Sequence, residues 1–495
     1  MGALCRRSQG KQDIPVSRRD LVKLTAALLA PANAAAAAVR GGQDLLPTGS
    51  PIVVVGDSID QSNFNTGPTP AVRQSGKVIN IGSGEVVAAL AMDPRASLMA
   101  WNDVTDDKAL LSNAPRYYSS GAVGRAGAVS PDIIAEIPRA AAYLGNAAGL
   151  GILGGGTNYL GLSDAAFYAA KLAEIDALHA ALPHVPWGVC TVRAVGASQI
   201  GLNGRTVANI AAKNAQIAAA VAARSSFCSL IDLSAYADDP ARPGQGLDIN
   251  FATNPYQSAP GGDGLHPGLY GVSQKGGPAI AAFVRAHVLS GNAFVARRIA
   301  SVLPTGVPLL LGSSPISHTA TAGGGTVTGV VAANIDVVPA NANASNIVCS
   351  LEGNAETGGQ TLVLTVFPAG SASKELWSLR LNPIGVTTTA LQNKWSRTWF
   401  EIEVDQWAGW LQVGAANGER SDFANNQQAG LFGIYPLGSG RRRLYPHTAH
   451  LQYGATSSGC LPSLNIQCIP SVGGGPGVIK LRQWDVQIEA SPVRP

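Results

Sequence analysis

The sequence lacks long hydrophobic runs and carries few charges. Only 13% of its 495 residues are charged. The apolar stretch from Leu24 to Ala30 is far shorter than the roughly 20 residues that span a bilayer. No other stretch resembles a membrane span, so none is expected. The length exceeds that of a single ordinary core and favours two or three domains.

Cysteine is also scarce, with six residues in the whole chain. Cys5 lies in a leader described below, and the odd number that remains excludes a fully intramolecular disulfide framework. None has the paired spacing of a zinc site. Cys460 and Cys468 are close enough to staple a loop in an oxidising compartment. Cys190 and Cys228 lie in apolar runs and are equally well interpreted as buried free thiols.

Residues 1–34 are predicted to be an export signal rather than part of the folded body. The paired Arg18 and Arg19 precede the short apolar stretch, and Ala32-Asn33-Ala34 follows it as a small-residue cleavage site. This pattern resembles a twin-arginine signal, which carries a prefolded bacterial protein to the periplasm or out of the cell. A disordered tail is the alternative interpretation.

Positive charge is concentrated in this leader. It contains six basic residues against two acids, so the formal net charge of +4 falls to about zero without it. A neutral chain gives no electrostatic reason to expect a nucleic-acid partner.

Residues 50–291 alternate short apolar runs with helical segments, which is typical of a parallel sheet with crossover helices. The predicted strands are Ile52–Val55, Lys77–Ile81, Gly149–Leu153, Trp187–Val192 and Ser229–Leu233. The predicted helices are Pro131–Leu144, Ala165–Leu182, Val207–Ala223 and Gly277–Leu289. In the second helix Leu172, Ile175 and Leu178 form the apolar stripe, and Lys171, Glu174 and Asp176 are expected to face elsewhere.

The composition changes after Asn292. Residues 292–329 are rich in Gly, Pro, Ser and Thr and are predicted to be a linker. Residues 330–495 contain alternating runs such as Thr361–Val366, Trp399–Val404 and Val478–Val486. We interpret this last part as an antiparallel β-sandwich with jelly-roll character.

Six of the eight tryptophans lie in this last part of the chain. Flat aromatic faces can stack on the apolar C–H face of a sugar ring. Most of the six are expected in the core. Trp407 and Trp410 are the pair predicted to be exposed and to bind carbohydrate.

Four short motifs occur in order along residues 50–291. Gly56-Asp57-Ser58 ends the first strand, Tyr118–Gly124 precedes a helix, Gly154–Asn158 follows a strand, and Asp263-Gly264-Leu265-His266 precedes the last helix. Alone, Ser58 could be an ordinary N-cap. Together the motifs resemble those of the SGNH (GDSL-like) hydrolase family. The resemblance implies a three-layer α/β/α, flavodoxin-like domain and ester hydrolysis.

The resemblance also assigns roles. Ser58 matches the nucleophile, His266 the general base, and Asp263 the acid that orients and stabilises the imidazole. The oxyanion hole would consist of the backbone N–H groups of Ser58 and Gly124 and the side-chain amide of Asn158. Gly121 is an alternative to Gly124.

The chain departs from the family pattern at one position. The third motif usually ends in an acid, and here Tyr159 stands in its place, which affects the hydrogen bonding of that loop. His179, His184 and His287 are less plausible bases than His266. Asp103, Asp106 and Asp107 are more typical of a solvated loop than of a metal site. Serine chemistry needs no ion, so no metal or other cofactor is expected.

The sequence therefore predicts an exported serine esterase. The tryptophan-rich last third favours acetylated polysaccharide or oligosaccharide as substrate. One alternative is a lipase or thioesterase-like hydrolase of longer acyl chains. A second is an inactive envelope protein that binds carbohydrate. The oligomeric state does not follow from the sequence.

Overall fold

The computed structural model describes two parts of the chain. In the first it describes residues 45–61, 84–97, 122–124, 127–252, 262–291 and Ala293, and in the second the strands between Pro315 and Glu489 with a few flanking residues. The predicted export signal and the strand predicted at Lys77–Ile81 lie outside the described residues. Among those described, no helix combines the length and hydropathy that a bilayer crossing requires.

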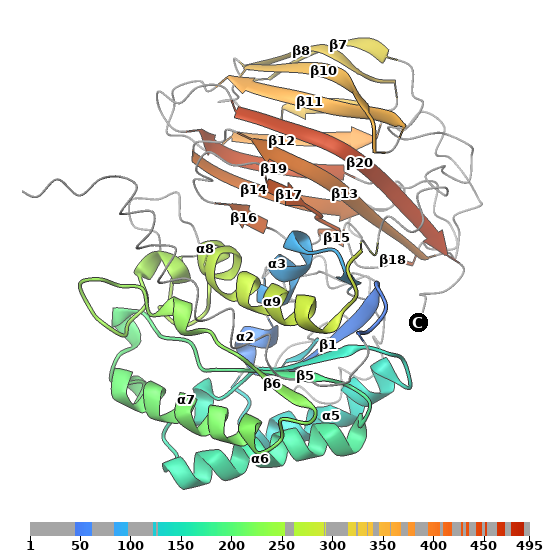
Figure 1. Cartoon of the computed structure of the whole chain (residues 1–495). Helices are drawn as coiled ribbons and strands as arrows, with labels where there is room; N and C mark the ends of the chain where they lie inside the picture. The colour runs from blue at the N-terminus through green and yellow to red at the C-terminus, as the bar shows by residue number, and fades with distance from the viewer. Residues whose placement is uncertain are drawn as a thin grey trace, which may run out of the picture. The chain divides into compact units, whose positions relative to one another are not determined.

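A parallel sheet forms the centre of the first part (Figure 1). Its strands follow the order β2-β1-β4-β5-β6, and β3 pairs with the C-terminal half of β1. The bounds are β1 Ser50–Gly56, β2 Ala96–Ser97, β3 Ala122–Gly124, β4 Leu150–Leu153, β5 Trp187–Cys190 and β6 Cys228–Ile231. Every residue of β1 is buried, as expected of a strand covered on both faces.

Helices cover both faces of this sheet (Figure 1). Val53 and Val55 of β1 pack into the apolar cluster of α5 (Ser130–Leu144), α6 (Asp164–Ala181) and α7 (Val207–Ala222). Ile52 and Val54 pack into the opposite cluster, with α3 (Glu85–Met92) and α9 (Gly277–His287). Because side chains alternate along a strand, one run of four residues serves both layers. The predicted α/β architecture is confirmed.

Short elements complete the first part. They are α2 (Ser58–Gln61), α8 (Leu269–Gly271), the π-helical turn Val272–Gly276, and 3-10 turns at Thr157–Tyr159, Ala197–Gln199, Leu202–Gly204, Ser234–Tyr236 and Asp248–Phe251. All predicted strands and helices that fall on described residues are present, with ends that differ by a few residues.

One expectation about α6 is wrong. Lys171 and Glu174 do not face away from the core, because both side chains are 0% exposed. They lie at helical spacing with Ile175 and Leu178 and therefore share the buried face. Their burial is possible because the ammonium and the carboxylate bond each other and nearby polar groups, which compensates the loss of hydration.

The second part contains two sheets. One is mixed, with the order β17-β13-β20-β11-β10-β8-β7 and β18 beside β13, and the other is antiparallel, with the order β15-β14-β19-β12-β9 and β16 beside β14. The bounds are β7 Pro315–Ala322, β8 Gly325–Ala332, β9 Ile335–Pro339, β10 Asn346–Asn354, β11 Gly359–Phe367, β12 Glu375–Leu381, β13 Trp395–Asp405, β14 Gly409–Asn417, β15 Gln427–Gln428, β16 Phe432–Ile434, β17 Arg442–Leu444, β18 Leu451–Gln452, β19 Ser463–Pro470 and β20 Gly477–Glu489.

The strands begin earlier than the sequence suggested. β7 and β8 occupy residues assigned to the linker, so strand structure starts at Pro315 rather than at about residue 330. Alternating Thr and Val residues favour strand there despite the nearby glycines. The jelly-roll topology stays a prediction.

Two of the six tryptophans belong to the core of this part. Trp399 and Trp484 are 0% and 1% exposed. Trp407 and the side chain of Trp410 lie outside the described residues, as does the predicted Cys460–Cys468 pairing. Cys190, Cys228 and Cys349 are buried thiols, which confirms the interpretation of the first two.

Candidate active site

Ser58 stands where β1 ends and α2 begins. The strand ends at Gly56, and the helix starts at Ser58 itself. The turn between them is fixed by side chains, because Asp60 Oδ2 accepts from the Asp57 N–H at 3.1 Å and Asp57 Oδ1 accepts from the Ile59 N–H at 2.9 Å. A serine in this position lies at the carboxyl end of a parallel sheet, where open α/β folds bind ligands.

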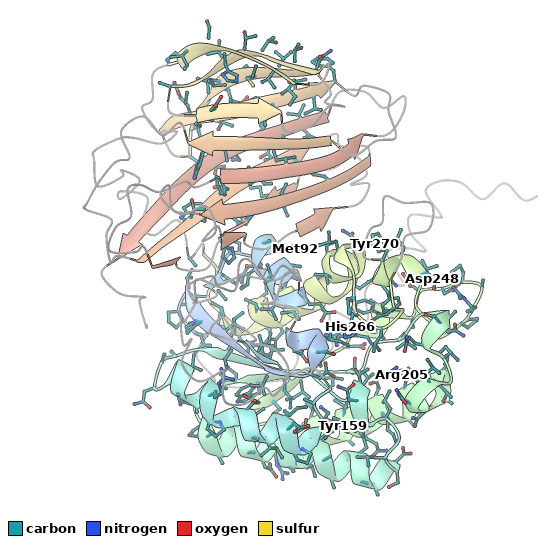
Figure 2. The ribbon with its side chains drawn as sticks, turned by 180° about the vertical axis from the view of Figure 1, so that it is seen from behind. Met92, Tyr159, Arg205, Asp248, His266 and Tyr270 are labelled. Atoms are coloured by element: carbon teal, nitrogen blue, oxygen red, sulfur yellow. The ribbon has the colours of Figure 1, made fainter. Side chains whose placement is uncertain are left out.

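The structure brings Ser58, His266 and Asp263 into one hydrogen-bonded chain, across 208 residues of sequence. Ser58 Oγ lies 2.9 Å from His266 Nε2, and His266 Nδ1 lies 2.5 Å from Asp263 Oδ2. Asp263 Oδ1 accepts from the N–H groups of Leu265 and His266, both at 2.8 Å. With Nδ1–H donated to the carboxylate, Nε2 is left to accept the serine proton. Figure 2 labels His266 in this site.

The charges of this chain support each other. The hydrogen bond with Asp263 raises the pKa of His266, and the nearby charge of Arg205 opposes that rise. Burial alone would raise the pKa of Asp263, but the hydrogen bonds from His266 and Leu265 hold it well below its usual range. The carboxylate therefore stays ionised at neutral pH and stabilises the imidazolium that forms when His266 takes a proton.

The Asp263–His266 turn is open to solvent and is held from one side. The side chains of His266 and Asp263 are 43% and 48% exposed. The Asp263 carbonyl accepts from Gln199 Nε2 at 2.6 Å and from Ser198 Oγ at 3.3 Å, and Arg205 Nη1 donates to Gln199 Oε1 at 2.6 Å. The segment 198–205 therefore holds the turn that carries His266, while the imidazole stays accessible to a ligand.

The predicted oxyanion donors lie on neighbouring strands. Gly124 of β3 pairs in register with Gly56 of β1, and Asn158 follows β4 on the other side of β1. Asn158 Nδ2 donates to the Ala128 carbonyl at 3.1 Å. A primary amide has two hydrogens, so one is left for a ligand. Gly121, the alternative to Gly124, lies outside the described residues.

Sequence reasoning missed a pair of buried carboxyl groups beneath Ser58. Asp57 and Asp60 are 1% and 3% exposed. Burial and the charge of Asp57 raise the pKa of Asp60 to about 7, and burial also raises the pKa of Asp57. Gly56 and Gly154 flank Asp60 so closely that a Cβ on either would lie within 2.1 Å of its carboxylate oxygens. The local sequence carries no signal of this burial, because Gly154 follows β4, far from Asp60 in the sequence.

A second missed network lies on the α3 face of the sheet. Arg193 follows β5 and donates through Nε to Glu85 Oε1 at 2.8 Å and through Nη2 to Glu85 Oε2. Tyr236 Oη donates to Glu85 Oε1 at 2.6 Å. All three side chains are buried. They form a buried polar cluster that also acts on the turn at Ser58, because the charge of Arg193 opposes the rise in the pKa of Asp57 and Asp60.

The three histidines considered above as alternative bases have structural partners. His179 stacks on Phe227 with ring centroids 3.8 Å apart. His184 Nε2 lies 3.1 Å from the Ala147 carbonyl and His287 Nδ1 lies 2.8 Å from the Phe283 carbonyl. Within the described residues, no group of three or more His, Cys, Asp and Glu side chains could hold a metal.

Comparison with known proteins gives matches only among solved structures. No family model and no curated protein matches the chain. The lipase/acylhydrolase from Enterococcus faecalis is 15% identical, with a TM-score of 0.32 over 49% of this chain and 99% of that one. The family 3 carbohydrate esterase of Clostridium thermocellum is also 15% identical, with a TM-score of 0.31 over 48% and 98%. A carbohydrate esterase family 3 structure from Talaromyces cellulolyticus is 17% identical, with a TM-score of 0.29 over 48% and 98%.

The described parallel sheet, with helices on both faces, is an α/β architecture. At these identities and TM-scores none of the three structures decides what the chain does. Ser58, His266 and Asp263 supply a nucleophile, a base and an orienting acid in hydrogen-bonding order, which is an arrangement suited to acyl transfer.

Proposed function

We propose that the chain is a serine hydrolase that cleaves carboxylic esters through an acyl-enzyme on Ser58. The observation that carries the proposal is the continuous hydrogen-bonded chain from Ser58 Oγ through His266 to Asp263. A serine hydroxyl becomes nucleophilic only when a base takes its proton, and this geometry supplies that base. The buried turn of Asp57 and Asp60 fixes the serine in place.

The reaction follows from this geometry in two halves. Ser58 Oγ attacks the ester carbonyl carbon while its proton passes to His266 Nε2, and the carbonyl electron pair moves onto oxygen. Collapse of the tetrahedral intermediate breaks the bond to the alcohol, which leaves with the proton from His266. Water then attacks the carbonyl carbon of the acyl-serine while His266 takes its proton. Collapse of the second tetrahedral intermediate releases the carboxylic acid, and His266 returns the proton to Ser58 Oγ.

The oxyanion formed in each half needs hydrogen-bond donors. We assign this role to the backbone N–H groups of Ser58 and Gly124 and to the second amide hydrogen of Asn158. β1, β3 and β4 are neighbouring parallel strands, so these groups lie at or just after the carboxyl ends of adjacent strands. Loss of one such donor typically costs ~3 kcal/mol of transition-state stabilisation.

For the substrate we propose an O-acetylated carbohydrate. The tryptophan-rich composition of the last third supports it, with Trp407 and Trp410 as the stacking pair. Two of the similar structures are described as carbohydrate esterases. The leader at residues 1–34 supports an export route, which would bring the enzyme to extracytoplasmic polysaccharide.

Ser58→Ala tests the mechanism. We expect it to abolish hydrolysis of 4-nitrophenyl acetate while circular dichroism and the melting temperature stay close to those of the wild type. Ser234→Ala, which changes an exposed serine elsewhere in the same part, is the matched control. Turnover by the Ser58 variant at the wild-type rate would exclude the proposed nucleophile.

A series of nitrophenyl esters separates the acetyl esterase from a lipase-like enzyme. Preference for acyl chains of about eight carbons or more would exclude the acetyl esterase, because a site for acetate offers little apolar surface to a long chain. Acetate release from acetylated glycans then identifies the alcohol. Retention on a polysaccharide column without any esterase activity would favour the inactive binding protein instead.

A further inference from the structure

The loop from Gly154 to Asn158 is hydrogen-bonded to the buried ammonium group of Lys171. Gly155 and Gly156 have φ values of +79° and +114°, a region that favours glycine. At this bend Lys171 Nζ of α6 donates to the Gly154 carbonyl at 3.1 Å and to the Gly155 carbonyl at 3.3 Å. The charge of Lys171 is therefore bound to the backbone that leads to Asn158.

Lys171 uses its whole donor capacity in these contacts. The third bond runs from Nζ to Glu174 Oε2 at 2.8 Å, and an ammonium group has three hydrogens. The side chains of Lys171 and Glu174 are both 0% exposed. Such a pair tolerates little movement, because any displaced partner leaves a desolvated charge behind.

Tyr159 ties the other end of the loop to the same helix. Its hydroxyl donates to Glu174 Oε1 at 2.6 Å, and its ring lies 5.5 Å from Lys171 Nζ. Burial and the Glu174 charge raise the pKa of Tyr159 well above its ordinary value, so the phenol keeps the proton it donates. Figure 2 labels Tyr159. This tyrosine immediately follows Asn158 and stands where the family pattern has an acid.

We propose that Lys171, Glu174 and Tyr159 form a positioning unit that aims the Asn158 amide at the oxyanion. The unit fixes the backbone on both sides of Asn158, through the carbonyls of Gly154 and Gly155 before it and through Tyr159 after it. This inference rests on the proposed esterase function.

The test compares three variants by kcat and KM for 4-nitrophenyl acetate. Tyr159→Phe removes one oxygen and should lower kcat about tenfold with KM changed less than about twofold, because a misaimed donor weakens only the transition state. Lys171→Met frees two loop carbonyls and should lower kcat about a hundredfold.

Lys213→Met is the matched control. Lys213 is also a buried lysine, 2% exposed in its side chain, and its Nζ bonds the Leu162 carbonyl at 2.5 Å and Asp164 Oδ1 at 2.6 Å. Neither hydrogen bond reaches Gly154–Asn158, and toward that loop Lys213 contacts the ring of Phe167, whose centroid lies 5.6 Å from Nζ. Its kcat should stay within about twofold of the wild type, because loss of stability alone does not misaim a donor.

Binding of phenylboronic acid gives a readout that a merely structural role would not move. Boron forms a tetrahedral adduct with the serine oxygen, and this adduct resembles the tetrahedral intermediate. The dissociation constant of phenylboronic acid should therefore rise about tenfold in Tyr159→Phe, matching the fall in kcat. The adduct should form equally well in the wild type and in Lys213→Met.

The outcomes separate this inference from the function on which it rests. A wild-type chain without esterase activity, or an active Ser58→Ala variant, contradicts the proposed function. An active wild type whose kcat is unchanged in Tyr159→Phe overturns the positioning unit, and so does an equal loss in Tyr159→Phe and Lys213→Met. Tyr159→Phe decides the question even where Lys171→Met fails to fold.

Discussion

The buried Asp60 makes the stability of the protein fall with rising pH. Its pKa of about 7 in the folded chain exceeds the ordinary value of 3.8. Below pH 3.8 the carboxyl is protonated in both states. Between the two values only the folded state keeps the proton, so stability decreases as pH rises, and above about pH 7 the loss is complete.

Asp60→Asn removes this dependence with little change of shape. At 1.36 kcal/mol for each pKa unit, the interval from 3.8 to about 7 corresponds to roughly 4 kcal/mol. The amide oxygen of an asparagine can still accept from the Asp57 N–H. We therefore expect the stability of the variant relative to the wild type to rise by up to roughly 4 kcal/mol between pH 4 and pH 8.

Thermal unfolding followed by far-ultraviolet circular dichroism at half-unit pH steps provides the assay. Asp232→Asn is the control for net charge, because Asp232 is an exposed carboxylate in the same part of the chain. A difference in melting temperature between Asp60→Asn and the wild type that stays constant across the pH range would refute the reasoning. It would show that Asp60 has the same pKa in the folded and unfolded states.

Two further predictions concern the acid of the site and the network on the α3 face. Asp263→Asn should lower kcat by about 10⁴-fold, as expected when a triad carboxylate becomes an amide. His266 must be neutral to act as base, so kcat/KM of the wild type should rise with pH through a pKa above the ordinary 6.5 of histidine. In Asp263→Asn the same rise in kcat/KM should occur at lower pH, because the hydrogen bond that raises the pKa of His266 is weakened. Glu85→Gln should cost about 3–5 kcal/mol of unfolding free energy by removing the hydrogen-bonded countercharge of the buried Arg193. Tyr236→Phe should cost less, about 1.5–3 kcal/mol for one bond to a charged acceptor, and the reverse order in urea unfolding would contradict this account.

Local composition was enough to predict most of the α/β part. The apolar residues of β1 and the helical spacing of Leu172, Ile175 and Leu178 each define an element without knowledge of the rest of the fold. The partnership of Ser58 and His266 is different, since nothing in either segment indicates a neighbour 208 residues away. That prediction came from the order of four motifs and their resemblance to a family.

The buried charges could not be predicted in the same way. Lys171 and Glu174 sit on the apolar stripe of α6, and a charged residue is usually assigned to solvent because its burial is costly. Only the loop carbonyls and Tyr159, supplied by another segment, make that burial acceptable. Asp60 is similar, because its enclosure depends on Gly154 from β4's end. Tertiary partners decide such positions.

The proposed nucleophile and its proposed base lie near opposite ends of the α/β part. Ser58 follows the first strand of the sheet, and His266 comes just before the final helix, α9. During synthesis the nucleophile therefore leaves the ribosome long before its base does. The proposed ester hydrolysis cannot begin until nearly the whole part has been made and folded, so the onset of activity would report the completion of the fold in a translating or refolding chain.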